Sequence, residues 1–551
     1  MRAERAGGDV GASGRVVLDR RVLDRPVRGR GGGLLLLGGS PWHVVRLAAS
    51  AADLVGRLRA AGPAGLVPSG RADRAAAAAL VEHGFAHPAA PGRAGAAPAA
   101  DRMAVVVPAY GRPDLLAACL ASVGGRGLEV VVVDDASPDE AAVARAVRVG
   151  GARRVRHAAN RGPAAARNTG LAATSAPVVA FLDSDCTADP DDLAALLPLF
   201  DDPRVGAVAP RVRPRDPAPG PPTRRGAPSL LARHEAARSA LDMGPHPALV
   251  RPGAALGFVP SAALLVRRAA LDGGAFDPAL RLGEDVDLGW RLAAARWHVR
   301  YEPAATVWHA ARVRPGEWLR RRFDYGTSAA DLDRRHPGRL APARPSAWNL
   351  AALALLVAGR PATATAVTAL ATALLHRRLR TVGAAPGLTA LIVAKGLAAD
   401  ALALGHALRR EWWPLGWAAL VRAARVGTFW PASVTSGPGN VYRDVTFAGR
   451  FLPTRGDYGR RLARAAAGAM LAPLALELLR GLRSAGPDAH LRALSERAGP
   501  VGDATVRVDP VRYVLLRLAE DAAYGSGVIV SALRGRRPRA LLPVVRLPGR
   551  R

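Results

Sequence analysis

The sequence predicts an α/β fold built on a mostly parallel sheet, and three observations support this prediction. Apolar runs of strand length alternate with helical patterns between residues 103 and 182, and such alternation favours a parallel sheet. Polar residues follow each predicted strand, where open α/β sheets bind their ligands. The chain has 551 residues, which is enough for more than one domain and a sizeable core.

The predicted strands are short runs rich in β-branched or aromatic residues and bounded by polar ones, as buried strands are. They cover residues 103–110, 128–133, 155–156 and 178–182. Apolar residues at helical spacing predict helices between and after them, at residues 114–123, 139–149, 164–173 and 286–295. Each strand is thus connected to the next by a helix.

Pairs of acidic residues stand at the ends of these elements. Asp183 and Asp185 follow the last strand, and carboxylates at i and i+2 can both turn toward one Mg²⁺ or Mn²⁺ ion that also binds substrate phosphates. An Asx-turn with solvated acids is the alternative. For the pair 134–135 the alternative is a helix cap, and for the pair 284–285 it is a partner of the helix dipole.

Composition limits the function classes. The formal net charge is +32, but the arginines are scattered and Lys395 is the one lysine, so we favour phosphorylated substrates or an anionic membrane surface and expect no nucleic-acid partner. Cys119 and Cys186 belong to no C-x-x-C pattern, which indicates a reducing compartment. Residues 1–30 show no secretory signal, and we expect them to be disordered or poor in strands.

Residues 1–100 are predicted to form a small winged-helix-like module that ends in a linker. A strand at residues 33–39 and helices at 44–58 and 72–83 support this organisation. The alternative is an extension of the next domain. The Pro-, Ala- and Gly-rich residues 88–100 would be the linker.

Residues 341–551 are predicted to be helical. The apolar segments cover residues 347–375 (interrupted by Arg360-Pro361), 387–408, 412–421 and 466–479. A spanning helix needs about 20 apolar residues without a central charge, which none of them offers. We expect membrane-associated helices on the cytoplasmic face, which could include one or two spans, with a soluble helical domain as the alternative. Residues 430–458 form a loop-rich insert, and residues 509–527 predict a capped helix that ends at glycines.

Five motifs in chain order resemble the family-2 glycosyltransferases of GT-A fold. They are Val-Val-Pro108-Ala-Tyr110, Asp134-Asp135-Ala-Ser137, Asn160-Arg-Gly-Pro-Ala-Ala-Ala-Arg167-Asn-Thr-Gly170, Asp183-Ser184-Asp185 and Gly283-Glu284-Asp285. The resemblance implies that residues 101–340 form the catalytic domain. It assigns the nucleotide sugar to Pro108, Tyr110, Asp134, Asp135, Arg167, Asp183 and Ser184.

The resemblance also implies chemical roles. Asp185 and His309 would hold Mn²⁺ or Mg²⁺, which offsets the charge of the departing diphosphate. Asp285 would be the general base, with Glu284 beside it, in an inverting displacement. Gly257, Arg321 and Arg322 would face the acceptor or the diphosphate. Residues 317–327 lack the Gln-x-x-Arg-Trp spelling of relatives that build glycans processively.

The order of the whole chain resembles the mycofactocin system glycosyltransferases. The segments that carry this are Gly38-Gly39-Ser40-Pro41-Trp42, Gly84-Phe-Ala-His87-Pro88 and the helix from Arg512 to Gly525. The resemblance implies transfer of a hexose, glucose, from UDP-glucose to a peptide-derived redox cofactor or its precursor, which could be extended to an oligosaccharide. Two alternatives are a transferase acting on a lipid or cell-wall glycan at the membrane and a non-catalytic sugar-nucleotide-binding scaffold.

Overall fold

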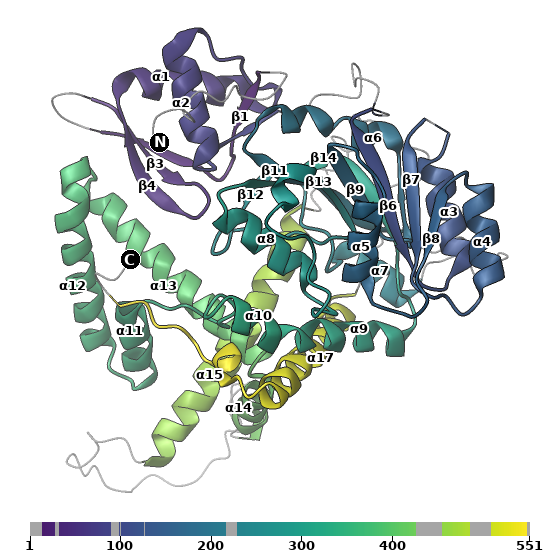
Figure 1. The fold of residues 1–551 in the computed structure, drawn as a ribbon. Coiled ribbons are helices and arrows are strands. Elements are labelled where there is room, and N and C mark those ends of the chain that lie inside the picture. Colours follow the sequence, from purple (N-terminus) through teal and green to yellow (C-terminus); the bar gives the residue numbers. More distant parts are fainter. Residues whose placement is uncertain are drawn as a thin grey trace, which may run out of the picture. The chain divides into compact units, whose positions relative to one another are not determined.

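A computed structural model describes residues 14–27, 32–89, 99, 101–125, 127–215, 229–425, 455–484 and 509–547. The chain forms two compact units, Met1–Trp318 and Leu319–Arg551 (Figure 1). The first unit contains all the sheets of the described residues, and the second is built from helices. The predicted winged-helix-like module and the predicted domain boundaries stay predictions.

The first unit is built on a nine-stranded mixed sheet. Its order is β10-β14-β11-β13-β9-β6-β7-β8, and β12 pairs with β14. The strands are β6 (Met103–Ala109), β7 (Glu129–Asp134), β8 (Arg153–Arg156), β9 (Val178–Leu182), β10 (Cys186–Ala188), β11 (Val205–Arg215), β12 (Ala248–Val250), β13 (Ala263–Arg267) and β14 (His298–Ala310).

The half formed by β9, β6, β7 and β8 is parallel, as the sequence predicts. Helices α3 (Pro113–Val123), α4 (Glu140–Val149) and α5 (Pro163–Ala172) connect its strands. Val105 and Val107 of β6 pack in one core cluster with α3 and α4, whereas Val106 packs in a second cluster with α5. Successive side chains of a strand point to opposite faces, and here both faces are covered by helices.

The strand order places a ligand site at one edge of this sheet. β6 has β7 on one side and β9 on the other, so the order of the strands reverses at β6. Open α/β sheets bind ligands at such a switch point, beyond the carboxyl ends of the strands. The sheet therefore brings Tyr110, Asp135 and Asp183 to the same edge.

Antiparallel strands complete the site. β13 pairs with β9, and the Asp183 N–H donates to the Ala262 carbonyl at 2.9 Å. Helix α8 (Glu284–Ala294) packs Leu288 and Leu292 into the same cluster as α5. Two short helices, α6 (Pro190–Ala194) and α7 (Leu230–Ala237), complete the unit.

The N-terminal part of this unit differs from two expectations. It contains β1 (Val16–Leu18) paired with β5 (Ala86–Pro88), the sheet β2 (Leu23–Pro26)-β3 (Leu34–Gly38)-β4 (His43–Leu47), and helices α1 (Ala49–Ala61) and α2 (Gly70–Glu82). The expectation that residues 1–30 lack strands is wrong for residues 16–26, because Val16 and Val22 are buried in this part's core. The helix expected from residue 44 begins at Ala49, since residues 43–47 pair with β3.

The second unit follows the predicted helical pattern more closely. Beginning with α9, which crosses the unit boundary, its main helices are α9 (Pro315–Thr327), α10 (Ala329–Arg335), α11 (Ala347–Val357), α12 (Pro361–Leu379), α13 (Pro386–Arg409), α14 (Trp413–Arg425), α15 (Arg455–Ser484) and α17 (Pro510–Arg534). The predicted interruption at Arg360-Pro361 is confirmed, and Pro361 takes the first helical position of α12. Residues 430–454 of the expected insert and most of the 88–100 linker lie outside the described residues. The expectation that residues 455–458 belong to this loop-rich insert is wrong, because α15 begins at Arg455.

The prediction that the last helix ends at its glycines is wrong, because α17 runs through both to Arg534. A Cβ atom at Gly525 would collide with the Arg410 carbonyl oxygen, and one at Gly527 with the Phe323 carbonyl oxygen. The glycines therefore permit close packing of neighbouring backbone instead of ending the helix.

Two described helices are long and apolar enough to cross a membrane, although that test is also passed by core helices of soluble proteins. They are α13 (Pro386–Arg409), with a mean hydropathy of 1.6, and the part of α15 from Tyr458 to Leu479, with 1.5. Large leucine side chains on α12 and α13 are exposed, including Leu370, Leu374 and Leu391.

Candidate active site

Arg167 joins the donor-side and acceptor-side motifs. Its side chain on α5 is only 3% exposed. The guanidinium donates to Asp183 at 2.7 Å and to Glu284 at 2.8 Å, and it lies 5.3 Å from the centre of the Phe276 ring. One planar cation thus neutralises a carboxylate from the end of β9 and another from the start of α8. Its predicted contact with the nucleotide stays a prediction.

Asp285 is fixed by backbone groups beside this pair. Its carboxylate accepts from the N–H of Ser261 at 3.1 Å and from that of Val286 at 2.8 Å. Burial raises the pKa of Asp285, although both N–H groups and Arg167 oppose the rise. Burial and the negative charge of Asp285 also raise the pKa of Glu284, although the positive charge of Arg167 acts to lower it. A raised pKa suits a carboxylate to take a proton near neutral pH.

Asp185 and His309 lie together because β10 pairs with β14, which sets Cys186 opposite His309. Nε2 of His309 is 3.4 Å from Oδ1 of Asp185. Arg112 and Arg312 approach the other oxygen at 3.7 and 3.6 Å. Burial opposes ionisation of Asp185, but His309, Arg312 and Arg112 lower its pKa to about 2. The carboxylate is therefore ionised at neutral pH.

Asp185 and His309 suit a divalent ion whose remaining coordination positions are filled by the substrate. In the part of the chain that the structure describes, no group of three or more His, Cys, Asp or Glu side chains could hold a metal ion. Mg²⁺ and ions like it are commonly held by one or two carboxylates together with water and substrate phosphates. A carboxylate and an imidazole would serve in this way, and the two nearby arginines suit a diphosphate.

The sequence reasoning missed Arg112 and Arg312. Arg112 immediately precedes α3 and has a positive φ of 52°, two residues after Tyr110, and Arg312 follows His309 by three residues. Their proximity to known motif residues was the available signal. Their convergence on Asp185 depends on the pairing of strands far apart in the sequence.

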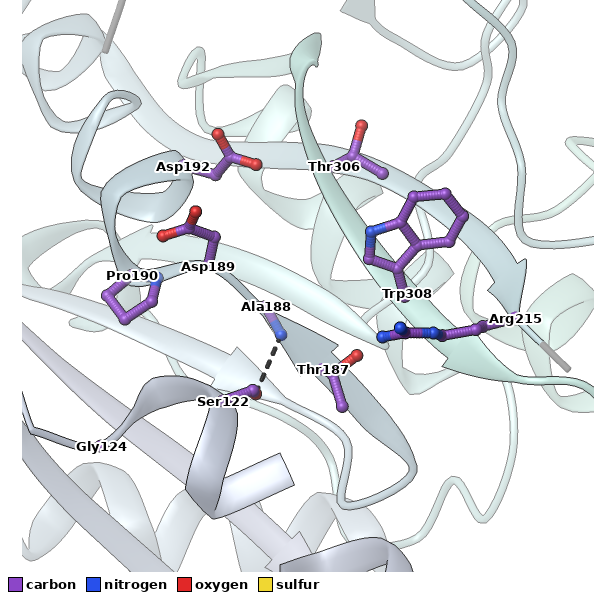
Figure 2. Close-up of a pocket in the computed structure, with 10 residues that line it drawn as sticks. All are labelled: Ser122, Gly124, Thr187, Ala188, Asp189, Pro190, Asp192, Arg215, Thr306 and Trp308. Carbon is purple, nitrogen blue, oxygen red and sulfur yellow. Dashed lines mark hydrogen bonds between the residues drawn. The ribbon is translucent and has the colours of Figure 1, made fainter. Parts of the chain in front are cut away.

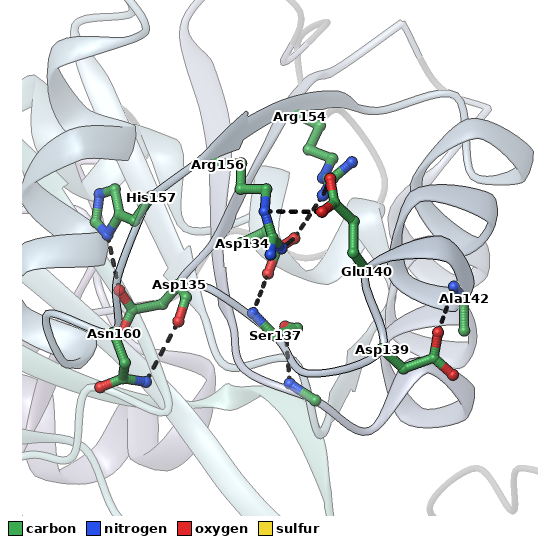
Figure 3. A network of polar contacts seen from close by, with 11 residues as sticks. Asp134, Asp135, Ser137, Asp139, Glu140, Ala142, Arg154, Arg156, His157 and Asn160 are labelled. Atoms are coloured by element: carbon green, nitrogen blue, oxygen red, sulfur yellow. Dashed lines mark hydrogen bonds and ion pairs between the residues drawn. The ribbon is translucent and has the colours of Figure 1, made fainter.

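Asp134 is a buried acceptor of a polar network (Figure 3). It accepts from the Ser137 N–H at 2.9 Å, from Arg154 at 2.7 Å and from Arg156 at 2.6 Å. Burial of the carboxylate acts to raise the pKa of Asp134, but these hydrogen bonds outweigh burial and lower the pKa. It does not cap α4, because Asp139 does so by accepting from the Ala142 N–H.

Asp135 shapes the loop that precedes α5. Its carboxylate accepts from the N–H groups of Arg161 and Gly162, both at 2.8 Å. It also lies 2.7 Å from Nδ1 of His157 (Figure 3). The other ring nitrogen of His157 is 2.9 Å from the Thr169 hydroxyl on α5. Both acidic residues of this motif thus have internal partners, and their contact with a base stays a prediction.

The remaining predicted residues fall into two groups. Tyr110 follows β6 at the switch point with its side chain 55% exposed, and Pro108 and Ser184 are half-buried at the same edge. The Gly257 carbonyl accepts from the Trp290 indole of α8 at 2.8 Å, which ties its loop to the acceptor-side helix.

Arg321 and Arg322 belong to the second unit and have partners there. Arg321 lies over the Tyr325 ring at 4.7 Å, and Arg322 donates to Glu520 at 2.8 Å. A role for them at the acceptor or the diphosphate stays a prediction.

The sheet and the carboxylates at its edge agree with the class of glycosyltransferases, and comparison with known proteins shows that the chain belongs to it. Residues 104–271 match the model of Glycosyl transferase family 2. The enzyme is therefore a family-2 glycosyltransferase with a GT-A core, as the sequence motifs predict.

Similarity along the chain then identifies the family. The chain is 34% identical over 536 residues to the Pre-mycofactocin glycosyltransferase of Mycobacterium tuberculosis, covering 95% of this chain and 97% of that protein. The chain belongs to the pre-mycofactocin glycosyltransferase family. It is also 41% identical over 98 residues to the succinoglycan biosynthesis protein ExoU of Rhizobium meliloti, which covers 17% of this chain and 29% of ExoU.

Among solved structures, a mannosyltransferase from Pyrobaculum calidifontis in complex with GDP-Man and Mn²⁺ is 22% identical. The match has a TM-score of 0.33 and covers 55% of this chain and 86% of the mannosyltransferase. Residues 1–349 of TarS from S. aureus are 17% identical, with a TM-score of 0.30 and coverage of 42% of this chain and 65% of that TarS fragment.

Proposed function

We propose that this enzyme transfers glucose from UDP-glucose to the peptide-derived precursor of mycofactocin, with inversion at the anomeric carbon. The observation that carries the proposal is the position of Asp285, which backbone N–H groups hold beside the Glu284–Arg167–Asp183 bridge. One base without a second acid suits direct displacement. The identity of the acceptor is inferred from the Pre-mycofactocin glycosyltransferase, which is similar to this protein over 95% of the chain.

The proposed mechanism uses residues of this chain at each stage. Asp285 takes the proton of the acceptor hydroxyl while that oxygen attacks the anomeric carbon, and the bond from this carbon to the diphosphate oxygen breaks with its electron pair on the diphosphate. Arg112 and Arg312 stabilise the departing charge. A divalent ion held by Asp185 and His309 would supply further positive charge there.

Nucleotide recognition is proposed for the edge of the parallel half. The exposed Tyr110 ring offers a surface for the base, and Pro108 and Ser184 line the approach. Asp134 and Asp135 act there by fixing the loops of this edge through their internal hydrogen bonds. The N-terminal module is proposed to bind the peptide part of the acceptor.

Incubation of the full chain with the mycofactocin precursor and several nucleotide sugars tests this function. Mass spectrometry should detect a gain of one hexose with UDP-glucose, and further gains would show that an oligosaccharide is built. Transfer to a polyprenyl phosphate or a cell-wall glycan, with none to the precursor, would overturn the proposed acceptor and support the alternative.

Metal dependence is a separate prediction. Chelation should abolish transfer, and Mn²⁺ or Mg²⁺ should restore it. Asp185→Ala should weaken the affinity for UDP-glucose, measured by calorimetry, only when metal is present, because the lost ligand acts through the ion. The matched control is Asp114→Ala, since Asp114 is an exposed carboxylate at the start of α3. Equal donor affinity of Asp185→Ala and Asp114→Ala in Mn²⁺ would rule out Asp185 as a ligand.

We also propose that the second unit binds the cytoplasmic membrane surface through the exposed leucines of α12 and α13. The full chain should float with vesicles that contain anionic lipid, and Leu370→Glu, Leu374→Glu and Leu391→Glu together should abolish flotation, because each change places a charge in the bilayer interface. Val149→Glu is the matched control, since Val149 is exposed on α4 of the first unit. Wild-type protein that stays with the lipid-free fractions contradicts this proposal.

A further inference from the structure

A pocket of about 470 Å³ lies beside the strand pair β10–β14 (Figure 2). Its walls include Thr187, Asp189, Asp192, Arg215, Thr306 and Trp308. Its volume is within the range of about 300–1,000 Å³ that is usual for small-molecule sites. None of the residues assigned above to the nucleotide sugar, the metal or the base lines it.

The pairing of β10 with β14 separates this pocket from the metal-binding pair. Thr187 lies opposite Trp308, and Cys186 lies opposite His309. Neighbouring residues of a strand point to opposite faces, so Trp308 and His309 project from opposite sides of β14. The pocket therefore lies behind the reaction centre and not within it.

Its lining combines an aromatic surface with charged groups. The Trp308 side chain is 36% exposed, and the Arg213 guanidinium lies 5.1 Å from its ring. In Figure 2, Trp308 and Arg215 lie on one side of the pocket and the carboxylates of Asp189 and Asp192 on the other. An apolar face opposed to hydrogen-bonding groups matches the amphipathic surface of a hexose ring.

The floor of the pocket is fixed by hydrogen bonds. The Ser122 hydroxyl accepts from the Ala188 N–H at 3.1 Å (Figure 2). It donates to the Cys119 carbonyl at 2.6 Å. Asp189 accepts from the Asp191 N–H at 3.0 Å as the N-cap of α6. The end of α3, β10 and the start of α6 are thus held together, and a ligand would meet a largely preformed surface.

We propose that this pocket binds a neutral hexose unit of a saccharide chain, separately from the donor site. The C–H face of the sugar would pack on Trp308, while its hydroxyls donate to Asp189 and Asp192 and accept from Arg215. The two carboxylates of the lining outnumber its one arginine, and their negative charge would repel a diphosphate. The lining therefore favours a neutral glycan over a nucleotide sugar. In naming glucose as the sugar, the inference rests on the proposed function.

Calorimetry of the full chain with the glucose trisaccharides maltotriose and cellotriose tests the inference without turnover. At least one of them should bind saturably, and binding should persist when UDP-glucose and Mn²⁺ are present. Trp308→Ala should weaken saccharide binding at least tenfold, whereas Trp308→Phe should retain most of it. Asp189→Asn should weaken it too, since asparagine keeps the helix cap but loses the charge.

Trp42→Ala is the matched control, because Trp42 is an exposed tryptophan of the N-terminal part, and it should leave saccharide binding unchanged. UDP-glucose affinity measured on the Trp308 and Asp189 variants reports whether the first unit remains folded. Absence of saturable binding, competition by UDP-glucose, or equal binding by Trp308→Phe, Asp189→Asn, Trp308→Ala and wild type would each overturn the inference. Saccharide binding without any transfer would overturn only the proposed function, and transfer without saccharide binding only this inference.

Discussion

Replacing Asp285 by asparagine should lower kcat by about 10²-fold or more and leave the affinity for UDP-glucose unchanged. The substitution keeps the shape of the side chain and removes its ability to take a proton. A general base acts in the transition state, so its loss should not affect binding of the donor. Steady-state kinetics with the precursor and donor calorimetry measure the two quantities.

The pH profile provides a second test of Asp285. Burial raises its pKa, so the wild-type rate should rise with pH through a value above the ordinary range of aspartate, as the carboxylate becomes ionised. This acidic limb should be absent from the residual activity of Asp285→Asn. Glu284→Gln, the matched neighbour, should lower kcat less.

A near wild-type rate for Asp285→Asn would place the base elsewhere. Asp287 and Glu284 are both buried and each pairs with an arginine at 2.8 Å, but Glu284 is adjacent to Asp285 and its pKa is raised by burial, which makes it the better candidate of the two.

The second large effect is expected at Arg167. Arg167→Met should lower the free energy of unfolding of the first unit by about 3–5 kcal/mol, because Asp183 and Glu284 lose the cation that both share. Methionine keeps much of the length and apolar volume of the side chain. Denaturant unfolding, together with amide hydrogen exchange of α5 and α8, measures the loss. Arg161→Met, at an exposed arginine before the same helix, should change stability by no more than about 0.5 kcal/mol.

A combined variant separates lost charge pairing from lost packing. Adding Asp183→Asn and Glu284→Gln to Arg167→Met removes the two unpaired charges and should restore part of the stability, which is the non-additivity expected of residues in contact. A single variant Arg167→Met as stable as Arg161→Met would show that the bridge contributes nothing.

The parallel half of the sheet was predictable because its signals are local. Each strand is a continuous apolar run of a few residues, and each helix follows in sequence, so the element bounds agree to within one or two residues. The pairing of β11 with β13 and β14 depends on residues up to about 100 positions apart, and no local pattern encodes it. β1 and β2 were not predicted, because each buries only a few side chains and the charged residues around them hide the apolar pattern of a strand.

In the candidate site, too, features set by local sequence were predictable and contacts between distant segments were not. The motif residues Asp183, Asp185 and Asp285 could be selected from residue type and order. The bridge could not, because Arg167 and Glu284 are 117 residues apart and only the packing of α5 against α8 brings them into contact. The internal partners of Asp135 likewise come from a loop 26 and 27 residues further on.

The glycines of α17 limit how the sequence of this enzyme can diverge. Even a methyl group at Gly525 or Gly527 would meet backbone oxygen atoms, which cannot rotate away as a side chain can. A substitution at either of these two positions is therefore not tolerated by itself, whereas the exposed Leu515 and Leu533 of the same helix can be substituted without disturbing the packing. Substitution at either glycine requires a compensating shift of α9 or of the residues around Arg410, so these segments are constrained to change together.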